Sequence, residues 1–172
     1  LKAFCGDNDG AVCTSTNAEG ILKWAFDRGQ KVFFFPDQHL GRNTCYKMGV
    51  PLEKMVVWNH DLEYGGNGEE AIRQSKIILW QGYCSVHQGF RPGYVGFFRD
   101  KYPGINILVH PECMFEVVQQ ADYAGSTAYI IKKIEEAEPG TKWAIGTEHH
   151  LVNRLKDDHP ELEVYPLSPY AC

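Results

Sequence analysis

A histidine, a carboxylate and two hydroxyls lie within one short stretch of the sequence. His110 and Glu112 follow the apolar run at 105–109, and Ser126 and Thr127 come shortly afterwards. The run is typical of a buried strand, and residues at a strand's carboxyl end in an α/β sheet lie where ligands bind. A Ser-Thr pair before a helical pattern can cap the helix and also bind an anion. A capped helix explains Ser126 alone, whereas His110 and Glu112 together favour a ligand site.

Two cysteines lie at matching places in the two halves of the chain. Cys84 and Cys172 each end a strand–loop segment, and His87 follows Cys84 by three residues. Thiols on equivalent loops could share a metal, but two ligands are too few for a closed zinc site or a stable iron–sulfur cluster. By spacing alone, structural cysteines remain the alternative. His87 is either a polar loop histidine or an acid–base group beside a metal.

Strand-like apolar runs alternate with amphipathic helical patterns, and this alternation must position the polar residues. The pattern predicts an α/β fold in which parallel strands end in polar loops on one side. We expect strands at 10–13, 31–35, 56–58, 76–80, 105–109, 142–146 and 161–165, and helices at 18–28, 43–47, 69–74, 95–101, 114–121, 128–138 and from about 149 to 156.

The two halves also indicate an internal duplication. Ser15 aligns with Ser126 and Pro36 with Thr147, both at an offset of 111 residues. Each half is therefore predicted to be a small layered unit of strands and helices.

Composition indicates a globular chain with a buried core. With 172 residues and 44% hydrophobic content the chain can bury a core, and its formal charge of −5 gives no general attraction to nucleic acid or anionic membranes. No apolar run approaches the roughly 20 residues of a membrane span, and no secretory signal is evident. The six cysteines are irregularly spaced, which favours a cytoplasmic enzyme over a disulfide framework.

The motifs together resemble the quinolinate synthase family, iron–sulfur enzymes of de novo NAD biosynthesis. The resemblance runs in family order over essentially the whole chain, and its phrases lie at 12–18, 35–41, 82–87, 110–113, 121–127 and 146–148, with the closing Cys172.

The resemblance implies a fold and a cofactor. The family has three pseudo-equivalent αβα domains with small parallel sheets that converge on a central 4Fe–4S cluster, to which each domain gives one cysteine. It implies that residues 1–84 form the second domain, that 85–172 form the third, and that Cys84 and Cys172 are cluster ligands. A third cysteine ligand is expected upstream of Leu1, in a first domain that these residues lack, so the fragment alone is expected to be inactive.

The resemblance also implies an activity, a transferase that condenses iminoaspartate with dihydroxyacetone phosphate to give quinolinate. The cluster would act as a Lewis acid, with Glu112 and His87 moving protons. Substrate would be bound by His110, Ser126 and Thr127, with Ser15 on the facing domain. Functional contact with L-aspartate oxidase or aspartate dehydrogenase is expected, with no nucleic-acid or membrane partner.

Two alternatives remain. One is a zinc-dependent hydrolase or lyase that uses His87, His110, Glu112 and the cysteines. The other is a non-catalytic anion-binding α/β domain, in which Ser126 and Thr127 only cap a helix and bind the anion.

Overall fold

The structure is a computed structural model that describes residues 1–168. The chain divides into two compact units, Leu1–Tyr83 and Cys84–Cys172, which we call unit 1 and unit 2. The domains that the family resemblance implies, residues 1–84 and 85–172, stay a prediction. Each unit is described by itself.

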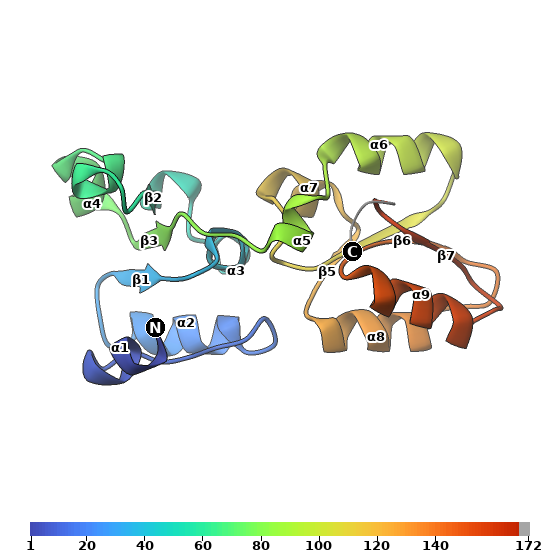
Figure 1. Ribbon diagram of the computed structural model, residues 1–172, viewed down its shortest axis with the longest axis horizontal. Helices are drawn as coiled ribbons and strands as arrows, with labels where there is room; N and C mark the ends of the chain where they lie inside the picture. Colours follow the sequence, from blue (N-terminus) through green and yellow to red (C-terminus); the bar gives the residue numbers. More distant parts are fainter. Residues whose placement is uncertain (169–172) are drawn as a thin grey trace. The chain divides into compact units, whose positions relative to one another are not determined.

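Unit 1 contains a small sheet of parallel strands in the order β1-β3-β2 (Figure 1). Single-turn 3₁₀ segments lie at Leu52–Lys54 and Glu63–Gly66. Its helices and strands are α1 (Lys2–Asp7), α2 (Ala18–Phe26), β1 (Val32–Phe34), α3 (Gln38–Lys47), β2 (Met55–Trp58), α4 (Glu69–Gln74) and β3 (Ile77–Trp80).

The core of unit 1 lies between one face of this sheet and helices α2 and α3. Leu22 of α2 and Leu40 of α3 are buried in one cluster with Phe34, Ile77 and Leu79 of the strands. Because side chains alternate along a strand, the residues between them lie on the other face. That face is aromatic, and Phe33 packs there edge-on against Trp58.

Unit 2 contains a second sheet of parallel strands, in the order β5-β4-β6-β7. Its elements are α5 (Ser85–Gln88), α6 (Pro92–Lys101), β4 (Asn106–Val109), α7 (Phe115–Gln120), β5 (Tyr123–Ala124), α8 (Thr127–Glu135), β6 (Lys142–Gly146), α9 (His149–Asp158) and β7 (Glu163–Pro166).

Helices cover both faces of the sheet of unit 2. One buried cluster joins Ile107 and Val109 of β4 to α6 and α7, and the other joins Leu108 of the same strand to α8 and α9. Figure 1 shows α6 and α7 on one side of the strands and α8 and α9 on the other. Unit 2 is therefore a three-layer αβα arrangement. The predicted fold class, α/β with small parallel sheets flanked by helices, is confirmed.

The strand expected at 10–13 was wrong. The backbone N–H of Gly10 donates to the carbonyl of Cys5 at 2.7 Å, so the chain turns back onto the end of α1 and no strand is present there. The short β5 was not predicted, because two residues are too few to show an alternating pattern.

The predicted duplication holds for some elements and not for the sheet pairing. Helix α3 spans Gln38–Lys47 and α9 spans His149–Asp158, so both ends are offset by 111 residues. The strands before and after these two helices are paired differently. Strands β6 and β7, on either side of α9, are neighbours in the sheet, whereas β1 and β2, on either side of α3, are separated by β3. Within the described part of the chain, no helix has the length and apolar character required to cross a bilayer.

Candidate functional site

The carboxyl edge of the sheet in unit 2 carries a row of polar residues. His110 follows β4, Ser126 follows β5 and Thr147 follows β6, and all three are buried. Since β4 pairs with both β5 and β6, these positions lie on neighbouring strands at one edge. This is the place where parallel α/β sheets bind ligands.

The single helical turn α5 holds two further residues of the candidate site. Cys84 is the N-cap of α5, partly exposed, and His87 lies in the turn with only 7% of its surface exposed. Phe90, directly after the turn, is fully buried in the cluster beneath α6 and α7. Its burial fixes the turn to the sheet, so the orientation of His87 is set by packing.

Cys84, His87 and Glu112 lie together. One potential ligand atom from each, a thiol sulfur, a ring nitrogen and a carboxylate oxygen, lies within 4.8 Å of the other two. The Nδ1 atom of His87 is 3.0 Å from the Oε2 atom of Glu112. A carboxylate can only accept, so Nδ1 carries the proton and Nε2 is left with a lone pair in the neutral ring.

The second histidine, His110, packs on the first. The rings of His87 and His110 are stacked, with centroids 4.4 Å apart and planes 13° from parallel. The backbone N–H of Glu112 donates to Nδ1 of His110 at 3.3 Å, which places the proton of a neutral ring on Nε2. Burial, followed by the nearby His87, lowers the pKa of His110 to about 4, so this ring is neutral at pH 7.

The pKa of Glu112 is also lowered, which for a carboxyl group favours the ionised form. The hydrogen bond from His87 lowers its pKa most, and burial partly opposes this shift. His110 and a hydrogen bond from the Cys84 thiol lower the pKa further. The thiol contributes least, so Glu112 stays ionised at neutral pH even if a metal displaces the proton of the Cys84 thiol.

One polar atom at this place is buried without a partner. The Nε2 atom of His87 has no hydrogen-bond partner among residues 1–168. Leaving such an atom unsatisfied is unfavourable by about 1–3 kcal/mol, so buried polar atoms without partners are uncommon. The orphaned nitrogen therefore fits a site that is completed by a ligand, and the sulfur, nitrogen and oxygen donors beside it are types that hold metals.

Ser126 and Thr127 begin α8. The side chain of Ser126 accepts from the backbone N–H of Tyr129 at 3.3 Å, which confirms the predicted cap, while Thr127 is the first helical residue and is exposed. The amino end of a nine-residue helix is favourable for an anion. These residues share the sheet edge with His110.

Two predicted site residues do not belong to the described part of unit 2. Ser15 is in unit 1, in the turn before α2, where the backbone N–H of Thr14 donates to the side chain of Asn17 at 2.7 Å. Cys172, the second predicted cluster ligand, lies outside the described residues.

Sequence reasoning did not anticipate the stacked histidine pair or the Cys84–Glu112 hydrogen bond. His87 and His110 are 23 residues apart in the chain and meet only through the packing of α5 against the sheet. The sequence signal was the polar residues that follow the strands. It indicated His110 in the histidine stack and Glu112 in the hydrogen bond with Cys84.

Comparisons with known proteins point to one family. The whole chain, residues 1–172, matches the family described as "Quinolinate synthetase A protein". It is 61% identical over 173 residues to a protein of Rhodopirellula baltica, 54% to one of Herpetosiphon aurantiacus and 53% to one of Geobacillus kaustophilus, each named quinolinate synthase. The matches cover 100% of this chain and 44%, 46% and 47% of the relatives, so the chain spans less than half of their length.

Proposed function

The chain belongs to the quinolinate synthetase A protein family, and we propose that it provides part of the active site of a quinolinate synthase. The proposed reaction condenses iminoaspartate with dihydroxyacetone phosphate, as a transferase of NAD biosynthesis. The observation that carries the proposal is the meeting of Cys84, His87 and Glu112 in a chain of this family.

Cys84 and Cys172 are the proposed ligands of a 4Fe–4S cluster, with a third cysteine expected upstream of Leu1, outside this chain. Cys84 suits this role because its thiol is partly exposed at the end of a fixed helical turn. When bound, a cluster with an open iron supplies a Lewis acid. The cytoplasmic location and functional contact with L-aspartate oxidase or aspartate dehydrogenase stay predictions.

His87 and Glu112 are the proposed proton-moving pair. The ionised Glu112 accepts the Nδ1 proton of His87 and so holds the ring in one tautomer, with the lone pair of Nε2 available. In this arrangement Nε2 takes a proton from a substrate carbon or hydroxyl, and Glu112 stabilises the resulting imidazolium. The same ring can return the proton when a hydroxyl leaves as water.

The remaining residues are proposed to bind and orient the substrates. A neutral His110 can donate from Nε2 to a carboxylate oxygen, and the amino end of α8 with Ser126 and Thr127 favours a negatively charged group. Ser15 of unit 1 is proposed to bind a carboxylate or the phosphate. Several donors are required because the substrates carry two carboxylates and a phosphate ester.

Replacing Glu112 by glutamine tests the proton-transfer role. In the whole protein that contains this chain, Glu112→Gln should lower quinolinate formation by about 10²–10⁴-fold, because the amide can donate as well as accept and carries no charge. It therefore no longer fixes the His87 tautomer, and it does not stabilise a charged ring. Glu116→Gln is a matched control, since Glu116 is exposed on the neighbouring α7 and should leave the rate unchanged. Equal activities of the two variants would contradict the role.

A zinc-dependent hydrolase or lyase is the second candidate, because a thiol, an imidazole and a carboxylate within 4.8 Å also suit zinc. Iron, sulfide and zinc analysis of the whole protein purified without oxygen, together with electron paramagnetic resonance, distinguishes the two. We expect iron with matching sulfide. Stoichiometric zinc without sulfide would favour the hydrolase or lyase.

A further inference from the structure

Unit 1 has a cavity at the edge of its sheet opposite to the carboxyl ends of the strands. It has a volume of about 780 Å³ and lies between the end of α2, the segment after α3 and the residues that precede β2 and β3. A volume of this size accommodates a small organic molecule such as a nucleotide. All of its lining residues belong to unit 1, and none is among the residues proposed for quinolinate synthesis.

A lysine precedes each strand of the sheet at this edge. Lys31, Lys54 and Lys76 come directly before β1, β2 and β3. The parallel register pairs Ile77 with both Val32 and Met55, so Lys76 lies between the other two lysines in the sheet. Neighbouring strands are about 4.8 Å apart, so the backbones of the three lysines lie in one row at this edge.

In the part of the chain that the structure describes, no carboxylate pairs with these three lysines, although the chain has more acidic than basic residues. The Lys31 amine donates to the backbone carbonyls of Ile72 and Arg73, and of the three lysines Lys54 and Lys76 line the cavity. Like charges on neighbouring strands repel, so an anion between them would stabilise this edge.

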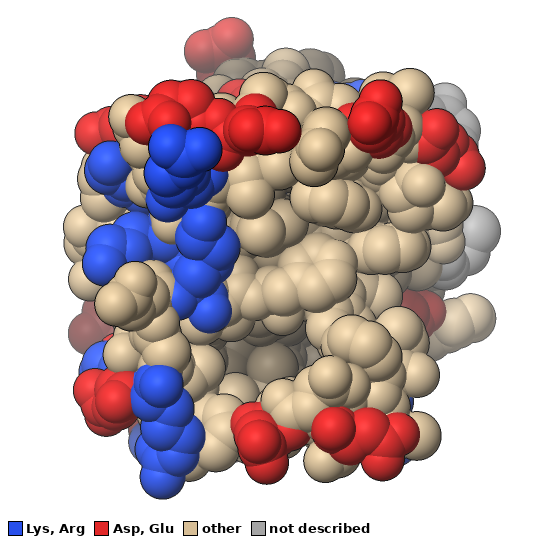
Figure 2. Space-filling model, turned by 90° about the vertical axis from the view of Figure 1, so that its left-hand side faces the viewer, with Lys and Arg blue, Asp and Glu red and all other residues tan. Residues whose placement is uncertain are grey.

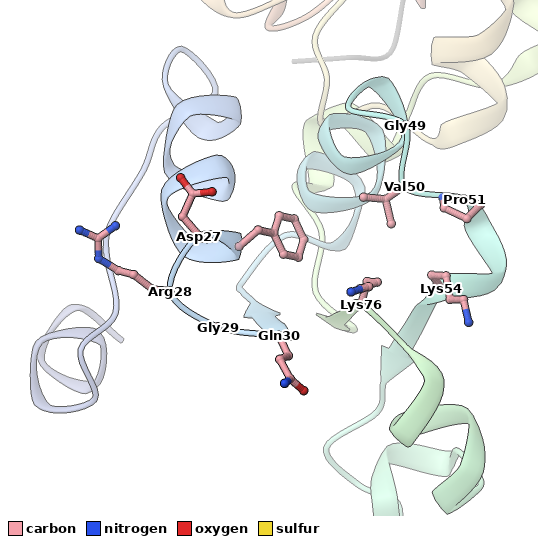
Figure 3. A pocket seen from close by; sticks show the side chains of 10 residues that line it. Asp27, Arg28, Gly29, Gln30, Gly49, Val50, Pro51, Lys54 and Lys76 are labelled. Carbon is pink, nitrogen blue, oxygen red and sulfur yellow. The ribbon is translucent and has the colours of Figure 1, made fainter.

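The figures show how the charged groups lie. Figure 2 views this end of unit 1, where Lys and Arg side chains gather along one side of the face and carboxylates lie toward its upper and lower margins. In Figure 3, Lys76 lies between Gln30 and Lys54 with its amine on the side of Gln30, while the amine of Lys54 and the side chains of Asp27 and Arg28 point away from this space. Arg28 also lines the cavity, and its guanidinium lies 4.5 Å above the centre of the Trp24 ring.

Apolar groups form the other wall. Phe26 at the end of α2 and Val50 with Pro51 after α3 line the cavity opposite the lysines. An aromatic or aliphatic surface beside two amines suits a ligand with an anionic end and a flat, less polar end. A free phosphate would use only the lysines.

We propose that this cavity binds a nucleoside diphosphate or a closely similar phosphorylated aromatic molecule. Its phosphates lie at the edge of the cavity that Lys54 and Lys76 line, and its ring lies against Phe26 and Val50. The ammonium groups act as point charges on the phosphates, as lysines do in other phosphate sites. The site is independent of the proposed quinolinate synthesis, because it uses neither the histidine pair nor the thiol of unit 2.

Calorimetric titration of the 172-residue chain with ADP, inorganic pyrophosphate and adenosine tests the proposal. ADP should bind, pyrophosphate should bind more weakly and adenosine should bind weakest, because the charge and the ring each contribute. The double variant Lys54→Gln/Lys76→Gln should bind ADP about tenfold more weakly or worse, since it loses two charged contacts. Lys2→Gln/Lys156→Gln removes the same charge from two exposed lysines outside the cavity and should bind normally.

Each other outcome overturns part or all of the proposal. If ADP does not bind at millimolar concentrations, or binds equally to both double variants, the site is wrong. If pyrophosphate binds as tightly as ADP, the apolar wall has no role and the ligand is a simple phosphate. Thermal unfolding gives a second readout: without ligand the cavity variant should melt no lower than wild type, and ADP should no longer raise its melting temperature.

Discussion

His110 and Glu112 share one environment and respond to it in opposite ways. Burial disfavours the charged form of both, but only Glu112 receives a hydrogen bond from His87 that restores its charge. As a result the site holds a neutral imidazole beside an ionised carboxylate at pH 7. The proposed roles, donor for His110 and proton-moving partner for Glu112, depend on that difference.

The lowered pKa of His110 predicts how the stability of the metal-free chain varies with pH. The ring titrates near 6.5 when the chain is unfolded and at about 4 when it is folded. Between these values the unfolded chain binds more protons, so stability falls as the pH is lowered from 6.5 to 4. Glu112, with its pKa below 4.5, contributes mainly at lower pH.

Urea unfolding at several pH values measures this effect. His110→Gln should flatten the fall in unfolding free energy across the window by on the order of 3 kcal/mol, because a shift of one pKa unit corresponds to about 1.4 kcal/mol. The variant also loses the bond from the Glu112 backbone, so the slope is the informative quantity. Equal slopes for wild type and variant would show that His110 is protonated in the folded chain.

The sequence suggested candidate residues for a site but not most of the contacts between them. His87 and Glu112 were predicted as one acid–base pair, and their 3.0 Å contact agrees with a shared place. The histidine stack could not be predicted, because it depends on how one helical turn packs against a strand end. The cavity lysines were missed although each precedes an apolar strand, since the register that aligns them is a property of the sheet.

At the scale of elements, the start of α8 combines a structural and a proposed binding role. Ser126→Ala should lower the unfolding free energy by about 1 kcal/mol through loss of the cap, whereas Thr127→Ala should change it by less than about 0.5 kcal/mol. In the whole protein both variants should raise KM for the anionic substrate. Unchanged KM values in both would leave Ser126 as a cap only.

Close packing of α3 against the sheet requires glycine at position 41. A Cβ atom there would lie 2.6 Å from Leu79 and 2.7 Å from Phe34, so Gly41→Ala should cost about 1–3 kcal/mol of unfolding free energy. Gly20→Ala is the matched control, because Gly20 is helical with open space around it, and alanine should stabilise it by about 0.5–1 kcal/mol. Similar thermal shifts for both would contradict the packing.

Element positions were predictable where periodicity was strong. The bounds of α4 and β6 agree residue for residue with the expectation. Helix α3 was expected only from Asn43 but begins at Gln38, because the Asp37 carboxylate caps it by accepting from the backbone N–H of Leu40 at 2.7 Å. The apolar pattern of the first turn was too weak to show that the helix begins there.

At the scale of the whole molecule, the two units contribute different chemistry. Unit 2 carries the thiol, the histidine pair and the carboxylate, and unit 1 carries Ser15 and the lysine-lined cavity. The chain spans less than half of its relatives, so the complete site is proposed to require residues outside it. The internal offset of 111 residues was visible in sequence, but the different strand orders were not, because pairing is decided by the assembled sheet.

Iron and sulfide content, measured in the whole protein after reconstitution without oxygen, tests the metal assignment of Cys84 most directly. Cys84→Ser should lose most of the iron and sulfide and the paramagnetic signal of the reduced cluster, because serine is a poor ligand for this centre. Cys5→Ser is the control, since Cys5 is also partly exposed but lies in α1, and it should keep the wild-type content. Full iron, sulfide and signal in the Cys84 variant would contradict the account.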